Sequence, residues 1–278
     1  MMSPRSTYIT AAGHEIHVSE WGDPAHPTLV MWHGMARNGR DFDEAAAALC
    51  DRYFVVCPDT LGRGLSAWAR DVADYSFATY QRIAMDILEH YGIGRLRFVG
   101  TSMGGLIGIT LAGGELKDRI THLVVNDIGP NVPGSAVGRI TSFVGTPPVF
   151  ATIAELEAWY RKNYAQFGNN TDKFWRRMAD SSYRRMDDGR VTVHYDPRIV
   201  NQLSNRQPDL SLWDCYDAVS AKTLLFRGAE SDVLPENVAA EMVRRGPRPR
   251  LEVRAGCGHA PALTSEAEIA LMRDFLAS

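Results

Sequence analysis

Cysteine is scarce in this 278-residue sequence, and long hydrophobic runs are absent. The four cysteines, Cys50, Cys57, Cys215 and Cys257, form no Cys-x-x-Cys pair, so their spacing argues against a zinc site or a thioredoxin-type motif. No run approaches the roughly 18 apolar residues that a membrane span needs, and the N-terminal residues lack the apolar core of a signal peptide. We therefore expect a cytoplasmic protein that holds no metal ion and does not associate with membranes.

The sequence also lacks a strong net charge and the glycine patterns of nucleotide-binding proteins. A formal charge of −3 provides no general attraction to nucleic acid. The pairs Gly62-x-Gly64 and Gly92-x-Gly94 lack the third glycine of a dinucleotide fingerprint, and no Walker A pattern occurs. We expect neither a nucleic-acid partner nor a cofactor. The composition, 45% hydrophobic and 23% charged, is that of an ordinary globular protein with one large domain or a domain carrying a sizeable insertion.

Strand-like runs alternate with helical patterns over most of the chain. After a hairpin over residues 8–21, apolar runs predict strands at 28–32, 53–57, 96–99, 122–126, 222–227 and 251–253. Apolar residues at helical spacing predict helices between these strands, the longest over residues 77–91. This alternation is typical of an α/β protein that has a mostly parallel central sheet with helices on both faces.

The alternation is interrupted between residues 131 and 215. This segment is rich in aromatic residues and nearly balanced in charge, so it is too apolar for a disordered linker. We expect it to be a mostly helical insertion. The predicted organisation is therefore a core domain formed by residues 1–130 and 216–278, interrupted by an inserted domain of residues 131–215.

Side chains that can carry chemistry follow several of the predicted strands. Ser102 comes after the strand at 96–99, Asp232 lies in the loop after 222–227, and His259 follows 251–253. Ligands of open parallel sheets bind beyond the carboxyl ends of the strands, so a serine, an acid and a histidine can meet at this edge. An activated serine nucleophile requires that set of neighbours.

The stretch from Gly100 to Gly104 predicts a sharp turn from a strand directly into a helix. Its Gly-x-Ser-x-Gly pattern, in this strand-turn-helix context, is that of a nucleophile elbow. The glycines let the strand and the helix pass close together without side-chain collision. The first N–H groups of the helix then face the reaction site, and we expect the backbone N–H of Met103 to bond an oxyanion.

On these motifs the chain resembles the α/β-hydrolase fold family over essentially its full length. His33-Gly34 looks like the family's oxyanion loop, and residues 59–66 are similar to its D-x-x-G-x-G-x-S turn. Residues 227–235 resemble its acid loop, and residues 258–261 resemble its histidine loop. The inserted domain of residues 131–215 is similar to the family's lid, or cap, in its placement.

The resemblance implies a role for each site residue. Ser102 is the expected nucleophile, His259 the general base, and Asp232 the acid that orients the histidine. The backbone N–H groups of Met35 and Met103 are the expected donors of the oxyanion hole.

Two other acids compete with Asp232. Asp127 follows the strand at 122–126, where some members of the family place their acid, and its other interpretation is a cap of the turn at Gly129. Glu230 lies two residues before Asp232, and its other interpretation is a solvated loop charge. We expect Asp232 to be the acid and take Asp127 as the alternative.

The implied activity is hydrolysis of carboxylic esters through an acyl-enzyme, with a small-molecule ester or related apolar acyl compound as substrate. A serine at position 102 argues against the dehalogenases and epoxide hydrolases of this fold, which use an aspartate nucleophile. The same triad also serves carbon–carbon bond hydrolases, enol-lactone hydrolases and cofactor-free peroxidases or dioxygenases. Some proteins of the fold are small-molecule receptors. These alternatives stay open, because specificity lies in the lid.

Overall fold

An eight-stranded sheet forms the centre of the computed structural model, which describes residues 3–204 and 211–278. The strand order is β1-β2-β4-β3-β5-β6-β10-β11. The two pairings of β2, with β1 and with β4, are antiparallel, and every pairing from β4 to β11 is parallel. The strands are β1 Arg5–Ala11, β2 His14–Trp21, β3 Thr28–Trp32, β4 Phe54–Pro58, β5 Leu96–Thr101, β6 Ile120–Asn126, β10 Lys222–Gly228 and β11 Arg250–Arg254. The expected mostly parallel sheet is confirmed.

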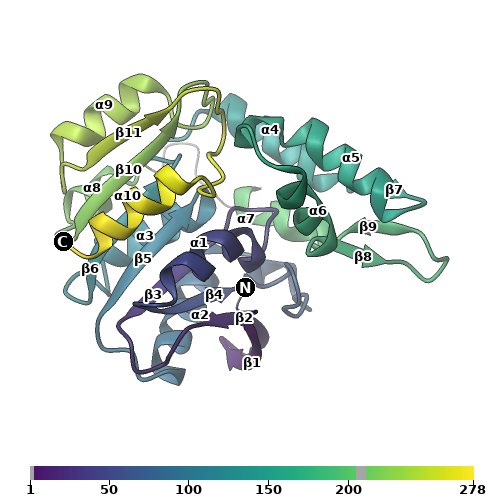
Figure 1. Ribbon diagram of the computed structural model, residues 1–278, viewed down its shortest axis with the longest axis horizontal. Coiled ribbons are helices and arrows are strands. Elements are labelled where there is room, and N and C mark those ends of the chain that lie inside the picture. The colour runs from purple at the N-terminus through teal and green to yellow at the C-terminus, as the bar shows by residue number, and fades with distance from the viewer. Residues whose placement is uncertain (1–2, 205–210) are drawn as a thin grey trace.

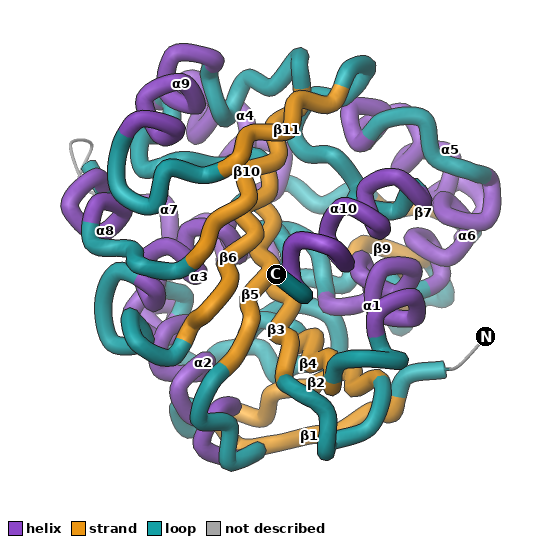
Figure 2. The backbone as a smooth tube through the Cα atoms, turned by 60° about the vertical axis from the view of Figure 1, so that its left-hand side comes forward, coloured by secondary structure: helices purple, strands orange, loops and turns teal. Residues whose placement is uncertain are grey.

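Helices cover both faces of this sheet, as Figure 2 shows. Side chains of strand β3 point alternately to the two faces. Leu29 and Met31 pack into one hydrophobic cluster, and Val30 and Trp32 pack into the other. Helices α1 and α10 cover the first face, and α2, α3, α8 and α9 contribute to the cluster on the second. Their bounds are α1 Asp43–Leu49, α2 Phe77–His90, α3 Met103–Ala112, α8 Trp213–Asp217, α9 Glu236–Arg244 and α10 Glu266–Leu276.

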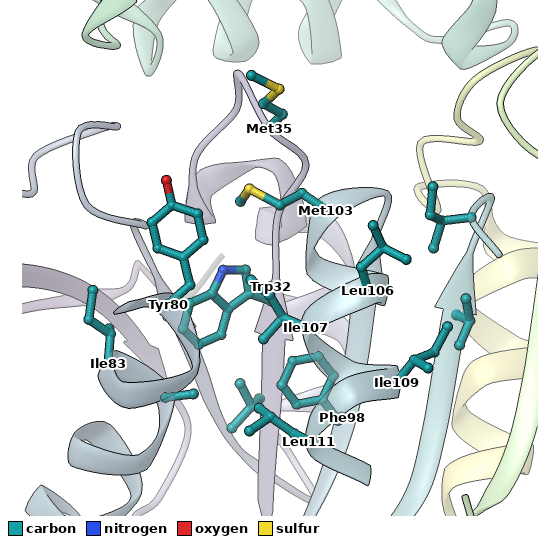
Figure 3. Packing of buried hydrophobic residues seen from close by; sticks show 14 of the residues in the cluster. Trp32, Met35, Tyr80, Ile83, Phe98, Met103, Leu106, Ile107, Ile109 and Leu111 are labelled. Carbon is teal, nitrogen blue, oxygen red and sulfur yellow. The ribbon is translucent and has the colours of Figure 1, made fainter. Parts of the chain in front are cut away.

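The hydrophobic core lies directly beneath the expected site. In Figure 3 the Trp32 side chain lies near Tyr80 and Phe98, with Ile107 beside it, and Met103 lies above them. The rings of Trp32 and Phe98 are stacked, with their centroids 6.3 Å apart. The carboxyl end of β3 and the start of α3 therefore rest on a rigid layer. Within the described ranges, no helix is both long and apolar enough to cross a membrane.

The elements between residues 134 and 204 form a group beside the sheet (Figure 1). Its helices are α4 Gly134–Gly145, α5 Ile153–Asn163, α6 Asp172–Asp180 and α7 Asn201–Ser204. It also contains a three-stranded antiparallel sheet in the order β7-β9-β8, formed by β7 Val149–Phe150, β9 Val191–Val193 and β8 Tyr183–Arg185. The expected helices are present, but this sheet was not predicted. Strands of two or three residues are too short to show an alternating pattern.

Buried polar contacts tie this inserted segment to the core. The Tyr75 hydroxyl donates to Asp196 Oδ2 at 2.7 Å, and Asn38 Nδ2 donates to the carbonyl of Ser181 at 2.7 Å. His194 Nδ1 accepts the backbone N–H of Gly64 at 2.7 Å. Since buried polar groups that lose their partners are costly, these bonds fix how the inserted segment sits over the carboxyl ends of the strands.

Candidate active site

Ser102 occupies a strained turn between β5 and α3. Its backbone φ of +52° and ψ of −116° lie outside the regions that side chains prefer. The turn is possible because its neighbours lack side chains. A Cβ on Gly104 would lie 2.1 Å from the carbonyl oxygen of Trp32, and a Cβ on Gly100 would lie 2.3 Å from that of Gly104. The predicted elbow is thus present, with Ser102 one residue before the first turn of α3.

His259 joins Ser102 to an acid through two hydrogen bonds. His259 Nε2 lies 2.8 Å from Ser102 Oγ, and His259 Nδ1 lies 2.8 Å from Asp127 Oδ2. Asp127 is fully buried, whereas the His259 side chain is 13% exposed. One ring nitrogen, Nδ1, therefore contacts a carboxylate, which can only accept a hydrogen bond. The other, Nε2, contacts the serine hydroxyl.

The acid in contact with His259 is Asp127, so the expectation that Asp232 takes this place is wrong in the structure. Asp232 lies four residues beyond the end of β10, and its carboxylate pairs with Arg139 of α4 at 2.7–2.9 Å in exposed surroundings. Glu230 is exposed. Asp127 instead follows β6 directly, with a φ of +55°. A positive φ is uncommon for residues other than glycine, and aspartate is among the few types that adopt it more often.

The loop after β10 holds the Asp127 carboxylate in place. Oδ1 of Asp127 accepts the backbone N–H of Gly228 at 2.8 Å, and Oδ2 accepts the Ser231 hydroxyl at 2.6 Å. The Ser231 hydroxyl oxygen is also close to the backbone N–H of Leu234, at 3.1 Å. Both carboxylate oxygens therefore accept a hydrogen bond from the loop after β10, which orients the face presented to His259.

The loop after β3 lies against Ser102. A Cβ placed on Gly34 would be 3.6 Å from the Ser102 Cβ. In Figure 3, Met35 stands at the tip of this loop above Met103, the first residue of α3. The N–H groups of a first helical turn have no partner within the helix. The two residues expected to supply oxyanion donors thus come from two different elements that meet beside the serine.

His33 fixes the base of this loop rather than moving protons. Its Nδ1 contacts the carbonyl of Gly34 at 2.7 Å, and its Nε2 accepts the backbone N–H of Thr60 at 2.9 Å. Complete burial lowers the pKa of His33 to about 4. A neutral ring with both nitrogens engaged is a structural tie between the loops that follow β3 and β4.

Arg63 is a fully buried guanidinium beside the same loop. Its Nε donates to the carbonyl of Met35 at 2.8 Å, and its Nη1 donates to the Tyr80 hydroxyl at 2.8 Å. Its Nη2 lies 3.7 Å from the Met103 sulfur and donates to Gln202 of α7 at 2.9 Å. Among the described residues none of its hydrogen-bond partners is a carboxylate. A positive charge therefore contacts both residues that are expected to supply the oxyanion donors, and its hydrogen-bond partners are neutral groups.

A cavity of about 310 Å³ opens onto Ser102 and His259. The loop after β3, the loop around His259 and the helices of the inserted segment line it together. Much of its wall is apolar, including Ile140, Phe143, Val144, Phe167, Phe174 and Pro261. This volume is at the small end for ligand pockets, so the site suits short, compact substrates.

Two charged residues form a pair in the wall of this cavity. Arg37 contacts both oxygens of Asp41, with the shortest distance 2.6 Å from Nη2 to Oδ1. Although burial opposes it, the neighbouring guanidinium lowers the pKa of Asp41. The Arg37 guanidinium also lies over the rings of Tyr160 and Tyr164. The opposite charges of Arg37 and Asp41 cancel, so this pair adds no net charge to the cavity wall.

A second Ser–His–Asp chain lies away from the cavity. Ser6 Oγ is 2.5 Å from His17 Nε2, and His17 Nδ1 is 2.8 Å from Asp59 Oδ2. Ser6 and His17 belong to the extended strands β1 and β2, and none of the three residues lines the cavity. This chain has the contacts of a triad without an elbow, which makes it a natural internal control for the reactivity of Ser102.

Sequence reasoning missed several residues that shape this site. Ser231 is adjacent in sequence to the favoured Asp232, and nothing in the residues around it marks it as the partner of Asp127. Arg63 falls in a variable position of a recognised turn motif. The pair of Arg37 and Asp41 has only a weak signal, its spacing of four residues.

Comparisons with known proteins agree with this architecture. The model of the alpha/beta hydrolase family matches residues 29–270. A 3-hydroxybutyrate-oligomer hydrolase from Cupriavidus necator is 38% identical, with 98% of each chain covered. An esterase from Mycobacterium tuberculosis is 28% identical over 83% of this chain and 75% of its own. The crystal structure of an alpha/beta hydrolase from Novosphingobium aromaticivorans has a TM-score of 0.90 at 30% identity and covers 100% of this chain and 99% of its own.

Proposed function

Since the chain belongs to the alpha/beta hydrolase family, we propose that it cleaves carboxylic esters through an acyl-enzyme formed on Ser102. The hydrolase class predicted from the sequence is confirmed by its relatives. In the proposed triad His259 is the general base and Asp127, rather than Asp232, is the acid. The observation that carries the proposal is the pair of 2.8 Å contacts that place His259 between Ser102 at the elbow and a fully buried carboxylate.

The acylation step follows from these contacts. Ser102 Oγ attacks the ester carbonyl carbon while His259 Nε2 takes the hydroxyl proton. Asp127 keeps the other ring proton on Nδ1 and stabilises the imidazolium that forms. The carbonyl oxygen becomes an oxyanion and accepts the backbone N–H groups of Met35 and Met103, each worth about 3–4 kcal/mol at such a transition state. The carbon–oxygen bond then breaks, and the alcohol leaves with the proton from His259.

Deacylation repeats the same chemistry with water. His259 Nε2 removes a proton from a water molecule that attacks the acyl carbon, and the same two N–H groups hold the second oxyanion. Collapse returns the proton to Ser102 and releases the carboxylic acid. No other reactant is needed, so one ester and one water give one alcohol and one acid.

The substrates we propose are short esters of hydroxyalkanoic acids. The relative from Cupriavidus necator, whose name states action on 3-hydroxybutyrate oligomers, aligns along nearly the full length of both chains. The cavity of about 310 Å³ with an apolar wall suits one or two such units better than a long acyl chain. In this proposal residues 131–215 act as a lid, because α4, α5 and α6 supply side chains to the wall of the cavity that contains Ser102.

Hydrolysis of the linear dimer and trimer of 3-hydroxybutyrate by the purified protein is the direct test. We expect release of the monomer at a rate that falls to background in Ser102→Ala. A fluorophosphonate should label Ser102, and Ser6→Ala, which removes the serine of the second chain, should be labelled as fast as the original protein. Turnover that survives Ser102→Ala, or an adduct on Ser6, would contradict the proposal.

A further inference from the structure

One charged side chain that lines the cavity forms its ion pair with a residue outside the lining. Among the described residues that line the cavity, the lysine, arginine, aspartate and glutamate side chains are Arg37, Asp41 and Arg139. Arg37 and Asp41 pair with each other. Arg139 pairs with Asp232, which does not line the cavity. The lining thus carries one more guanidinium than carboxylate.

Arg139 is positioned to use this charge. It shares a face of α4 with Ile140, Phe143 and Val144, all of which wall the cavity. Its side chain is 47% exposed, and that of Asp232 is 46% exposed. An exposed ion pair contributes little, because water competes for both partners. A carboxylate that enters the cavity can therefore share or replace Asp232 without a large penalty.

From this arrangement we propose that Arg139 binds the free carboxylate of the leaving hydroxy acid, while Asp232 holds the guanidinium ready between turnovers. This proposal rests on the ester hydrolase activity proposed above, and it defines the substrates as anionic oligoesters with a free carboxyl end. When a hydroxy-acid dimer is cleaved, the alcohol that leaves carries that carboxylate. The planar fork of arginine matches a carboxylate through two parallel hydrogen bonds.

A latch between the inserted segment and the core is the competing explanation for the same ion pair. The two explanations make opposite predictions for its two partners. If the pair is only a latch, removing either partner has the same effect on every substrate. If Arg139 is a carboxylate anchor, losing Arg139 weakens the binding of anionic substrates. Losing Asp232 frees the guanidinium and strengthens their binding.

The experiment compares the 3-hydroxybutyrate dimer as its free acid with the carboxamide of the same dimer, which has the same shape and no charge. We expect Arg139→Gln to lower the acid-to-carboxamide ratio of kcat/KM by about tenfold or more, mainly through KM, as expected for a hydrogen bond to a charged group. Asp232→Asn should raise the same ratio about twofold to fivefold. Arg161→Gln removes one charge from α5 outside the cavity lining and should leave the ratio unchanged.

Binding of 3-hydroxybutyrate to Ser102→Ala, with and without Arg139→Gln, gives a second readout that does not need turnover. We expect calorimetry to show weaker binding when Arg139 is absent. A ratio that shifts in the same direction in Arg139→Gln and Asp232→Asn, or does not shift at all, overturns the anchor while ester hydrolysis stands. If neither dimer is cleaved by the original protein, it is the proposed function that fails. If binding is equally strong without Arg139, the anchor fails on its own.

Discussion

Replacing Asp127 by asparagine tests the assignment of the acid most directly. The carboxylate has one oxygen on the backbone N–H of Gly228 and the other on Ser231 and His259. An asparagine offers one oxygen and one NH₂ group in the same space. The N–H of Gly228 can only donate, so it should hold the amide oxygen on its side and turn the NH₂ group toward His259.

That orientation reverses the tautomer of the imidazole. A donor facing His259 Nδ1 requires this nitrogen to be unprotonated, so the ring proton moves to Nε2, opposite Ser102 Oγ. The nitrogen that should receive the serine proton is then already protonated. In a serine-protease triad the same change lowers kcat by about 10⁴ with the geometry retained, which corresponds to about 5.5 kcal/mol in the activation free energy.

We therefore expect Asp127→Asn to lower kcat by about 10³–10⁴ on a p-nitrophenyl ester and to slow fluorophosphonate labelling of Ser102 in parallel. Asp232→Asn should have a far smaller effect on kcat with this neutral substrate. Near-ultraviolet circular dichroism of both variants checks that the fold is intact. The reasoning is refuted if folded Asp127→Asn keeps more than about a tenth of kcat while Asp232→Asn loses 10³ or more, because Asp232 would then be the working acid.

Three further predictions concern the elbow, the buried guanidinium and acid stability. Gly104→Ala should abolish Ser102 labelling and lower the melting temperature, because its Cβ would lie 2.1 Å from the Trp32 carbonyl oxygen; full labelling would contradict the elbow geometry. Arg63→Met leaves the Met35 carbonyl and other buried acceptors without a donor, so we expect a lower kcat, a nearly unchanged KM and a loss of about 2–4 kcal/mol in urea unfolding, with partial rescue by Arg63→Lys. Burial lowers the pKa of His33 and of His194 to about 4 from 6.5; only the unfolded chain takes up these protons as the pH falls from about 6.5, so the free energy of unfolding should decrease between pH 7 and pH 4, by about 3 kcal/mol for each histidine. Urea titrations that give the same stability at pH 7 and pH 5 would show that these rings are not kept neutral.

Local patterns predicted the scaffold and the sharp turn at Ser102 well. The strand predicted over residues 28–32 has the same bounds in the structure, and the one predicted over 122–126 ends at the same residue as β6. Both contain a run of at least three apolar residues that are buried in the structure, so the signal lies within the strand itself. The turn at Ser102 was equally easy to predict, because the glycines that permit it are near neighbours of Ser102 in sequence.

The aspartate that contacts His259 was harder to predict, because two loops distant in sequence determine which one it is. Asp127 and Asp232 both follow a strand, and the spacing alone cannot say which carboxylate faces His259. The choice depends on the backbone of Gly228 and the hydroxyl of Ser231, which approach Asp127 only once β10 has paired with β6. No local pattern records that contact. The short strands β7, β8 and β9 were missed for a related reason, since pairing rather than length defines them.

The two aspartates have different surroundings, and this suits them to different tasks. A carboxylate that stabilises an imidazolium must stay fixed while the reaction proceeds, and full burial with three hydrogen-bond donors holds Asp127 in place. A carboxylate that yields its partner to a substrate must release it readily, and the exposed ion pair with Arg139 gives Asp232 that property. In the proposed mechanism the loop after β10 would therefore serve both ends of the substrate. Ser231 supports the carboxylate that contacts His259, and the next residue, Asp232, holds the arginine proposed to bind the leaving group.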